Sequence, residues 1–354
     1  MQIGLVGLPR SGKTTFFNLL TGLEENTEFN PAADVHTGSA VVPDGRIDFL
    51  ASLYKPRKTV YARMIFNDIP GVRMNESGPR AAKLLDEVRA ADVLVQVVKA
   101  FSGDDGEEPT PFSDLEDYRT DLILSDMDAL EKRIDRIKSG KKIKKDAAEQ
   151  LAVLEKLLNV LEEERPLSDV QLDEKELEYL AGQSFLSEKP LIVAVNIDED
   201  QLSAADYPQR DRLFSYSKEQ DVPVFEICAQ TEMEINRLSP EDREEFMADL
   251  GLKESGLGRL AKTAYDLLGL ISFFTVGEDE VRAWTVRDGS SAKHAAGKIH
   301  SDLEQGFIRA EVFHYEDIFQ HGSAAKVREA GLFRLEGKDY KVRDGDIVSV
   351  RFNV

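Results

Sequence analysis

Near its N-terminus the sequence carries residues of the type and spacing that bind phosphate. Residues 7–14 read GLPRSGKT and fit the pattern G-x-x-x-x-G-K-[ST]. They follow a short apolar segment, residues 2–6, and lead into residues 14–21, which we expect to be helical. Glycines let backbone N–H groups converge on a triphosphate, while Lys13 reaches its terminal phosphates and Thr14 ligates Mg²⁺. The predicted phosphate-contacting residues are Gly7, Pro9, Arg10, Ser11, Gly12, Lys13, Thr14 and Thr15.

A second motif suited to phosphate chemistry, D-I-P-G, runs from Asp68 to Gly71 after an alternating segment at residues 61–67. An aspartate at the end of a core strand holds Mg²⁺ through water, and the glycine N–H contacts the γ-phosphate. D-x-x-G alone is common in ordinary turns, but its separation from the phosphate loop indicates a nucleotide switch. We therefore expect Lys13 and Gly71 to serve catalysis, and Thr14 and Asp68 to hold the metal.

A third motif, N-I-D-E from Asn196 to Glu199, follows the apolar run 191–195. Guanine-specific enzymes carry N-K-x-D at this place, and its aspartate accepts two hydrogen bonds from guanine. Here Ile197 replaces the lysine and Glu199 is one methylene longer, so we expect a weaker guanine preference. The plainer alternative is an acidic cap at the end of a strand. With the loop after the next strand, the predicted base-contacting residues are Asn196, Ile197, Glu199, Cys228, Ala229 and Gln230.

The elements around these motifs predict an α/β fold. The apolar runs 93–98, 191–195 and 222–227 are typical of strands buried on both faces of a mostly parallel, doubly wound sheet. Residues 117–164 are charged, glycine-poor and helical in period, which predicts an inserted helical hairpin. After about residue 270, alternating segments with glycines between them predict a small α+β domain; they are 281–286, 308–313, 340–342 and 347–352.

The predicted tip of the helical hairpin is rich in lysine. A projecting cationic tip contacts RNA phosphates with salt-sensitive affinity, whereas most charge runs are solvated surface. The candidate residues for RNA or ribosome binding are Lys138, Lys141, Lys142, Lys144 and Lys145.

Composition limits the class of protein. The 354 residues carry a net charge of −21, which argues against indiscriminate nucleic-acid binding by the whole surface. No apolar run reaches the roughly 20 residues that span a bilayer, so we expect no membrane partner. The single cysteine, Cys228, excludes an intrachain disulfide and is interpreted as a buried structural residue. With no signal peptide visible, we expect a cytoplasmic monomer.

These motifs, taken in order, resemble the Obg-like ATPase family, also called YchF. The resemblance runs end to end and is most specific at residues 254–260, 267–275, 280–285, 306–312 and 351–354. It implies a P-loop domain at 1–116 and 186–270, a helical coiled-coil domain at 117–185, and a TGS domain at 271–354. It also implies Mg²⁺ as cofactor, ATP preferred over GTP, and an association with ribosomes.

The chain departs from the family pattern in the residues that act on the terminal phosphate. Arg10 stands where the family has an asparagine, and it either contacts the phosphates in cis or faces solvent. Ala32 falls near the position of the family's switch threonine, flanked by Thr27 and Thr37, and residues 102–113 lack the family's loop histidine. We therefore expect slow intrinsic hydrolysis. A GTPase, or a non-hydrolysing nucleotide-tuned RNA- or ribosome-binding module, are the alternatives.

Overall fold

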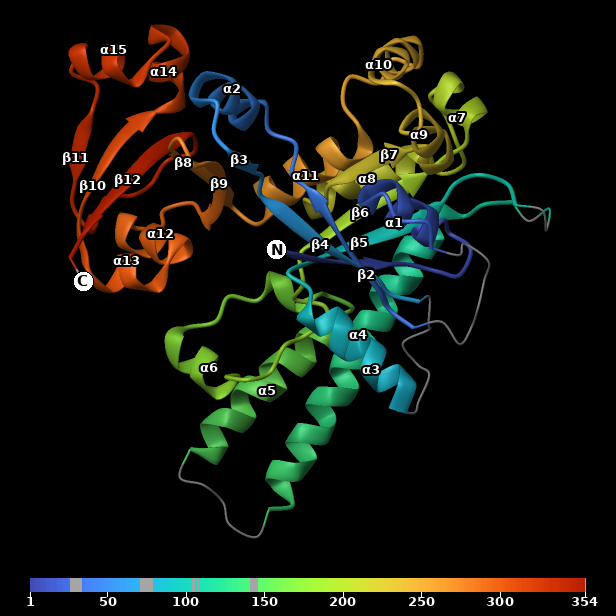
Figure 1. Cartoon of the computed structure of the whole chain (residues 1–354). Helices are drawn as coiled ribbons and strands as arrows, with labels where there is room; N and C mark the ends of the chain where they lie inside the picture. The colour runs from blue at the N-terminus through green and yellow to red at the C-terminus, as the bar shows by residue number, and fades with distance from the viewer. Residues whose placement is uncertain (26–33, 71–78, 104–105, 107, 141–145, 354) are drawn as a thin grey trace. The chain divides into compact units, whose positions relative to one another are not determined.

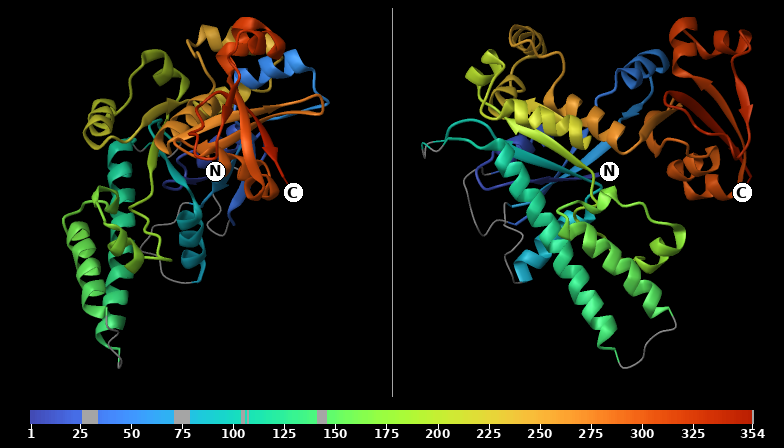
Figure 2. Two further views of the ribbon diagram at one scale, coloured as in Figure 1. Left: turned by 90° about the vertical axis from the view of Figure 1, so that its left-hand side faces the viewer. Right: turned by 180° about the vertical axis from the view of Figure 1, so that it is seen from behind.

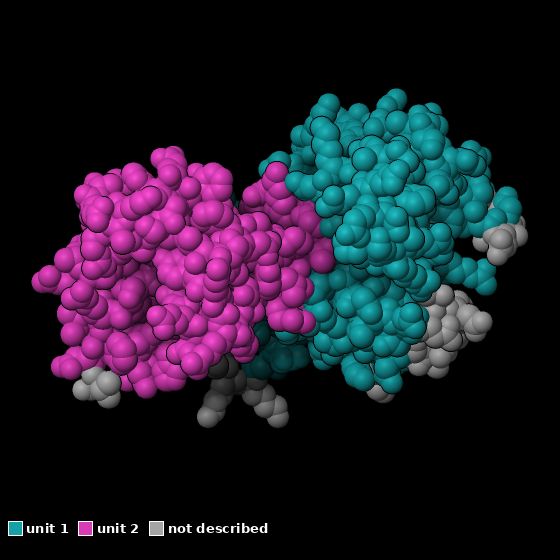
Figure 3. Space-filling model, turned by 45° about the horizontal axis from the view of Figure 1, so that its top comes forward, with its two compact units in different colours: residues 1–40, 65–256 teal, residues 41–64, 257–354 magenta. Residues whose placement is uncertain are grey.

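The computed structural model describes residues 1–25, 34–70, 79–103, 106, 108–140 and 146–353 (Figure 1). The chain divides into two compact units (Figure 3), one formed by residues 1–40 and 65–256 and the other by residues 41–64 and 257–354. No helix in the described ranges is long and apolar enough to cross a membrane.

The first unit is built on a six-stranded sheet with the order β2-β4-β1-β5-β6-β7 (Figure 1). The pairs β4–β1, β1–β5, β5–β6 and β6–β7 are all parallel, which confirms the predicted mostly parallel sheet. The order reverses at β1, because the chain places β4 on one side of it and β5 on the other. The strands are β1 (Gln2–Val6), β2 (His36–Val41), β4 (Arg63–Asp68), β5 (Val93–Lys99), β6 (Leu191–Asn196) and β7 (Val224–Ile227).

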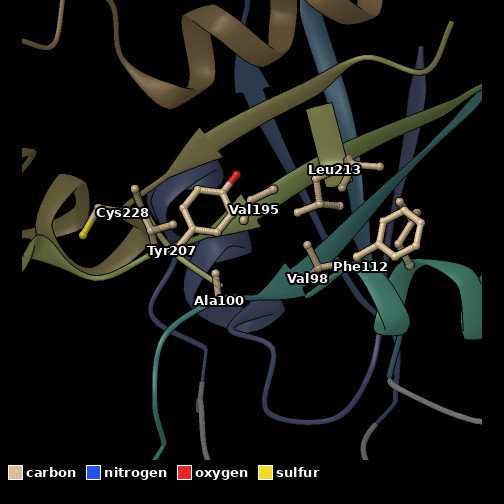
Figure 4. Packing of buried hydrophobic residues seen from close by; sticks show 10 residues of the cluster. Val98, Ala100, Phe112, Val195, Tyr207, Leu213 and Cys228 are labelled. Carbon is tan, nitrogen blue, oxygen red and sulfur yellow. The ribbon is translucent and has the colours of Figure 1, made fainter. Parts of the chain in front are cut away.

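Helices pack on this sheet through apolar side chains that the strands supply. Val98 and Val195 meet Phe112, Tyr207 and Leu213 in one buried cluster (Figure 4). A second cluster packs β1 and β5 against α3 and against α4 (Pro111–Lys138), the helix that also carries Phe112. The helices of the first unit besides the inserted segment are α1 (Lys13–Thr21), α3 (Pro79–Ala90), α7 (Glu199–Ala204), α8 (Arg210–Gln220), α9 (Ala229–Ile235) and α10 (Pro240–Asp249).

The predicted helical hairpin is confirmed. Helix α4 (Pro111–Lys138) and helix α5 (Ala147–Glu162) run side by side away from the sheet (Figure 2). Their facing stripes form one core, which includes Leu130, Ile134, Leu154, Leu157 and Leu161. The chain returns to β6 through η1 (Leu167–Asp169) and α6 (Glu174–Tyr179). Helix α4 begins before the expected residue 117, and its first turns pack on the sheet.

The second unit is a mixed sheet with the order β11-β10-β12-β8-β9-β3, which agrees with the predicted α+β class. Its strands are β3 (Lys58–Val60), β8 (Leu270–Val276), β9 (Glu280–Arg287), β10 (Phe307–His314), β11 (Arg334–Glu336) and β12 (Asp346–Phe352). Its helices are α2 (Gly45–Tyr54), α11 (Gly256–Leu267, which begins at the last residue of the first unit), α12 (Ala292–Ile299), α13 (Ser301–Gln305), α14 (Tyr315–His321) and α15 (Ala324–Glu329). The segment 340–342 is not a strand: Lys341 makes one isolated bridge with Ser291.

Residues 41–64 differ from the division that the sequence indicated, because they belong to the second unit. Strand β3 pairs in parallel with β9, and Ile47 and Leu50 of α2 are fully buried against Phe274 and Val281. The segment directly follows β2 in the chain, but burying these apolar side chains stabilises its packing in the second unit.

A buried carboxylate fastens the inserted hairpin where the chain returns to the sheet. Asp126 of α4 is 1% exposed and accepts hydrogen bonds from the Leu186 N–H at 2.9 Å, the Ser187 N–H at 2.8 Å and the Ser187 Oγ at 2.7 Å. These three bonds satisfy a charge that is costly to bury alone.

We expect Asp126→Ala to lower the free energy of unfolding by about 2–4 kcal/mol, because it leaves buried donors without acceptors. Urea unfolding followed by far-ultraviolet circular dichroism measures this loss from the midpoint and the slope of the transition. Asp128→Ala is the matched control: Asp128 lies on the same helix but pairs at the surface with Lys132. Its effect should stay within about 0.5 kcal/mol. Equal midpoints for the two variants would contradict the assignment.

Candidate functional site

The loop between β1 and α1 has a backbone that excludes side chains at two positions. Gly7 has φ 134° and Gly12 has φ 88°. A Cβ on Gly7 would lie 2.4 Å from the Val97 carbonyl oxygen, and one on Gly12 would lie 2.1 Å from the Asn196 Nδ2. The two glycines therefore meet both a conformational and a steric requirement, as expected for a loop that wraps phosphates.

The side chain of Lys13, the first residue of α1, is buried beneath this loop. Its Nζ donates to the carbonyl oxygens of Gly7 and Leu8, each at 2.9 Å, and the residue is 6% exposed. Burial lowers the pKa of Lys13 to about 8, although the charge of Asp68 opposes this shift. The ammonium is held by two neutral carbonyls, which anionic phosphate oxygens would replace as stronger partners.

The residues predicted to hold the metal meet directly. Thr14 Oγ1 donates to Asp68 Oδ2 at 2.8 Å, which joins the start of α1 to the end of β4. Asp68 Oδ1 is buried and has no hydrogen-bond partner among the described residues. Burial raises the pKa of Asp68, while the Thr14 hydrogen bond and the Lys13 charge act in the opposite direction. A hydroxyl and a carboxylate with an unsatisfied oxygen fit Mg²⁺, which uses few protein ligands and keeps its waters.

Asn196, at the end of β6, connects the phosphate loop to the predicted base loop. Its Nδ2 donates to the Ser11 carbonyl at 3.1 Å, and its Oδ1 accepts from the Ala229 N–H at 3.3 Å. The residue is 5% exposed. One amide therefore fixes three loops that lie at the same edge of the sheet.

The other predicted base-loop residues divide into buried and accessible ones. Ile197 and Cys228 are each 4% exposed and belong to the same apolar cluster. Burial raises the pKa of the Cys228 thiol, as expected for a structural cysteine. Glu199 and Gln230 are exposed, at the first turns of α7 and α9.

The acid that caps the helix after β6 is Asp198 rather than Glu199. Asp198 accepts from the Gln201 N–H at 2.9 Å in a capping box. Asp198 is therefore the acidic cap at the end of the strand, and the Glu199 carboxylate is exposed beside it.

Several predicted positions lie outside the described residues. They are Gly71, the position of the switch threonine at Ala32, Thr27, and four lysines of the basic tip, Lys141, Lys142, Lys144 and Lys145. Two flanking residues are described. Thr37 Oγ1 donates to Asn67 Oδ1 at 3.0 Å, so its hydroxyl is engaged within the sheet, and Lys138 pairs with Glu155 at 2.9 Å.

One residue of the site was missed by sequence reasoning. His36, at the start of β2, pairs with Glu25 at 2.8 Å, and its charge acts on the pKa of Asp68. Only the placement of β2 beside β4 brings His36 to this site. No local motif in the sequence could have indicated it.

The position of these residues on the sheet favours ligand binding. The phosphate loop follows β1, where the strand order reverses between β4 and β5. In open parallel sheets, ligands bind outside the carboxyl ends of the strands at such a reversal. Asp68 ends the neighbouring strand β4, and Asn196 ends β6 on the other side, so both lie at the carboxyl edge of the sheet.

Comparison with known proteins agrees with this geometry. The family model for the C-terminal region of YchF GTPases, described as a protein of unknown function, matches residues 270–353. The model described as a 50S ribosome-binding GTPase matches residues 2–124.

Full-length relatives are similar along the entire chain. The ribosome-binding ATPase YchF of Bacillus subtilis is 39% identical and covers 100% of both chains. The protein of the same name from Haemophilus influenzae is 40% identical over 100% of this chain and 99% of its own. Among solved structures, the YchF GTPase of Schizosaccharomyces pombe matches with a TM-score of 0.84 and 29% identity, over 99% of this chain and 97% of that one.

The lowered pKa of Lys13 makes triphosphate binding depend on pH. Free protein loses the Lys13 proton near pH 8, whereas bound phosphates hold that proton to higher pH. Affinity for a nucleoside triphosphate should then be constant below about pH 8 and should fall by up to about tenfold per pH unit above it. Calorimetry at pH 9 in buffers of different ionisation enthalpy should show proton uptake on binding. No uptake at pH 9 would mean that Lys13 stays protonated in the free protein.

Proposed function

The chain belongs to the YchF family, and on that premise we propose that it is a nucleotide-dependent switch that binds ATP in preference to GTP, hydrolyses it slowly and acts on the ribosome. The observation that carries the proposal is the meeting of Lys13, Thr14 and Asp68 beneath a loop whose backbone excludes side chains. We further propose a P-loop domain, a helical insertion and a C-terminal TGS domain as its functional parts, in a cytoplasmic monomer.

The nucleotide-binding role assigns one task to each residue of the cradle. Backbone N–H groups at the start of α1 would bind the phosphates, and Lys13 would exchange its two carbonyl partners for phosphate oxygens. Thr14 and Asp68 would hold Mg²⁺, which neutralises charge on the phosphates when bound. Gly71, by its position after Asp68, is the proposed sensor of the γ-phosphate.

The base preference rests on the loop that Asn196 fixes. With Asp198 engaged as a helix cap, Glu199 is the acid left to face a base. Its longer side chain displaces the carboxylate from the position that pairs with guanine, which supports a preference for ATP.

We expect slow hydrolysis because the chain departs from the family pattern at the switch threonine and the loop histidine, which would help to position the attacking water. Catalysis of phosphoryl transfer depends on positioning the nucleophile as well as on charge stabilisation. Thr37 is engaged with Asn67, and the sequence from 102 to 113 contains no histidine. The same facts support the alternative, a nucleotide-tuned ribosome-binding module without hydrolysis.

Base preference can be tested by equilibrium binding of MgATP and MgGTP. We expect the wild type to bind ATP more tightly and Glu199→Asp to shift the ratio toward GTP by about tenfold, since one displaced charged hydrogen bond is worth about that factor. Ile197 is left unchanged because a lysine there would bury a charge in the apolar cluster. Asp200→Asn, on the exposed side of the same helix, is the control and should not change the ratio.

A wild type that prefers GTP would replace the ATPase proposal with the GTPase alternative. Lys13→Ala serves as the reference for turnover. Phosphate release by wild type at the rate of this variant would favour the non-hydrolysing module.

Ribosome association is supported by the names of the relatives and by the lysines of the hairpin tip. If the tip binds RNA phosphates, replacing Lys141, Lys142, Lys144 and Lys145 by alanine should weaken co-sedimentation with ribosomes. It should also reduce the salt dependence of binding, by close to one unit of slope for each phosphate that is no longer neutralised. Lys132→Ala is the matched control, because Lys132 is an exposed lysine of the same hairpin that lies outside the candidate set and pairs with Asp128. An unchanged salt slope in the fourfold variant would exclude the tip as the RNA-binding element.

A further inference from the structure

The phosphate loop contains a turn occupied by an unfavourable residue. The Ser11 N–H donates to the Leu8 carbonyl at 3.4 Å, Pro9 takes the second position of the turn, and Arg10 takes the third with φ 62°. A type II turn has proline at its second position and a residue with positive φ at its third. That third position favours glycine or asparagine, because a Cβ is strained in the left-handed region.

Arg10 differs from the other non-glycine residues with positive φ. Lys55, Ala205 and Asp221 are helix C-caps and Glu164 directly follows the C-cap of α5, so at these four residues the left-handed conformation ends a helix. Gln209 is the N-cap of α8, and its side chain accepts from the Phe112 N–H at 2.9 Å. Arg10 ends no helix, and its side chain is exposed, without a hydrogen bond or ion pair to any residue of the described ranges. Backbone strain that local structure does not explain is characteristic of functional positions.

The surroundings of Arg10 indicate a polyanionic ligand. Ser11 Oγ, next in the chain, is 3% exposed and has no hydrogen-bond partner among the described residues. Lys13 Nζ is bound to the carbonyls of Gly7 and Leu8, and Leu8 is the first residue of the same turn. The loop therefore carries one cation at its base, a second on its strained turn, and an unsatisfied hydroxyl between them.

We propose that the Arg10 guanidinium binds the terminal phosphate of the bound triphosphate in cis and thereby makes the protein distinguish ATP from ADP. A guanidinium donates paired hydrogen bonds to two phosphate oxygens, which a lysine cannot do with the same geometry. The binding energy of this interaction offsets the strain in the turn. The inference rests on the proposed function, since it requires triphosphate binding at this loop.

The test compares binding of MgADP and of a non-hydrolysable ATP analogue, together with the melting temperature of the free protein. Arg10→Asn should raise the melting temperature, because asparagine tolerates the left-handed region. It should also lower the triphosphate-to-diphosphate affinity ratio at least about tenfold, the usual effect of losing a charged hydrogen bond. Arg10→Lys should give an intermediate ratio without raising the melting temperature.

Lys55→Asn is the matched control, because Lys55 is an exposed cation with φ 46° far from the loop in sequence. It should raise the melting temperature and leave both affinities unchanged. If Arg10→Asn does the same, or weakens ADP as much as the ATP analogue, the inference is wrong. The proposed function would still hold in that case if the wild type binds nucleotide and the Lys13→Ala variant does not. A wild type without nucleotide affinity would overturn both.

Discussion

The two hydrogen bonds of the Asn196 amide are the constraint on which the site depends. One bond holds the Ser11 carbonyl of the phosphate loop, and the other holds the Ala229 N–H at the start of α9. The close approach also explains Gly12, since any Cβ there would collide with this amide. Because the amide is buried, losing either bond leaves an unsatisfied polar group and costs about 1–3 kcal/mol. One side chain thus ties the phosphate loop to the predicted base loop.

Charge burial gives the site its second physical character. Lys13 and Asp68 are both removed from water. Burial lowers the pKa of Lys13 and raises that of Asp68, so in each case it favours the neutral form. Each partly compensates the other, and Thr14 joins them through the Asp68 carboxylate. A site with two poorly solvated charges and unsatisfied oxygens is arranged for a ligand that brings its own charges, as a magnesium triphosphate does.

Local patterns predicted the parts of the fold whose causes are local. The continuous apolar runs became β5 and β6, and residues 117–164, which are helical in period, form most of α4 and α5. Strand β3 has only three residues and exists through its pairing with β9, far along the chain, so no local pattern indicated it. The same non-local pairing placed residues 41–64 in the second unit.

The site follows the same division between local and distant causes. The spacing of Gly7, Gly12 and Lys13 identified the cradle, because those residues act within one short loop. The role of His36 depends on which strand lies beside β4, and the cap at Asp198 depends on which of two adjacent acids faces the helix backbone. Neither fact is contained in residue type or spacing alone.

The bond network of the base loop continues to the end of the first unit. Ala229, held by Asn196, begins α9, and one turn later the buried Glu232 accepts from the Gly256 N–H at 2.6 Å. Gly256 is the last residue of the first unit and the first of α11. These bonds connect the Ser11 carbonyl, through Asn196 and α9, to the point where the chain leaves the first unit. Contiguity alone does not make such a route allosteric; that requires an element with two states that both ends bias. Helix α9 is the element of this route that such a change would have to move, because its first residue, Ala229, and its central residue, Glu232, carry the two bonds.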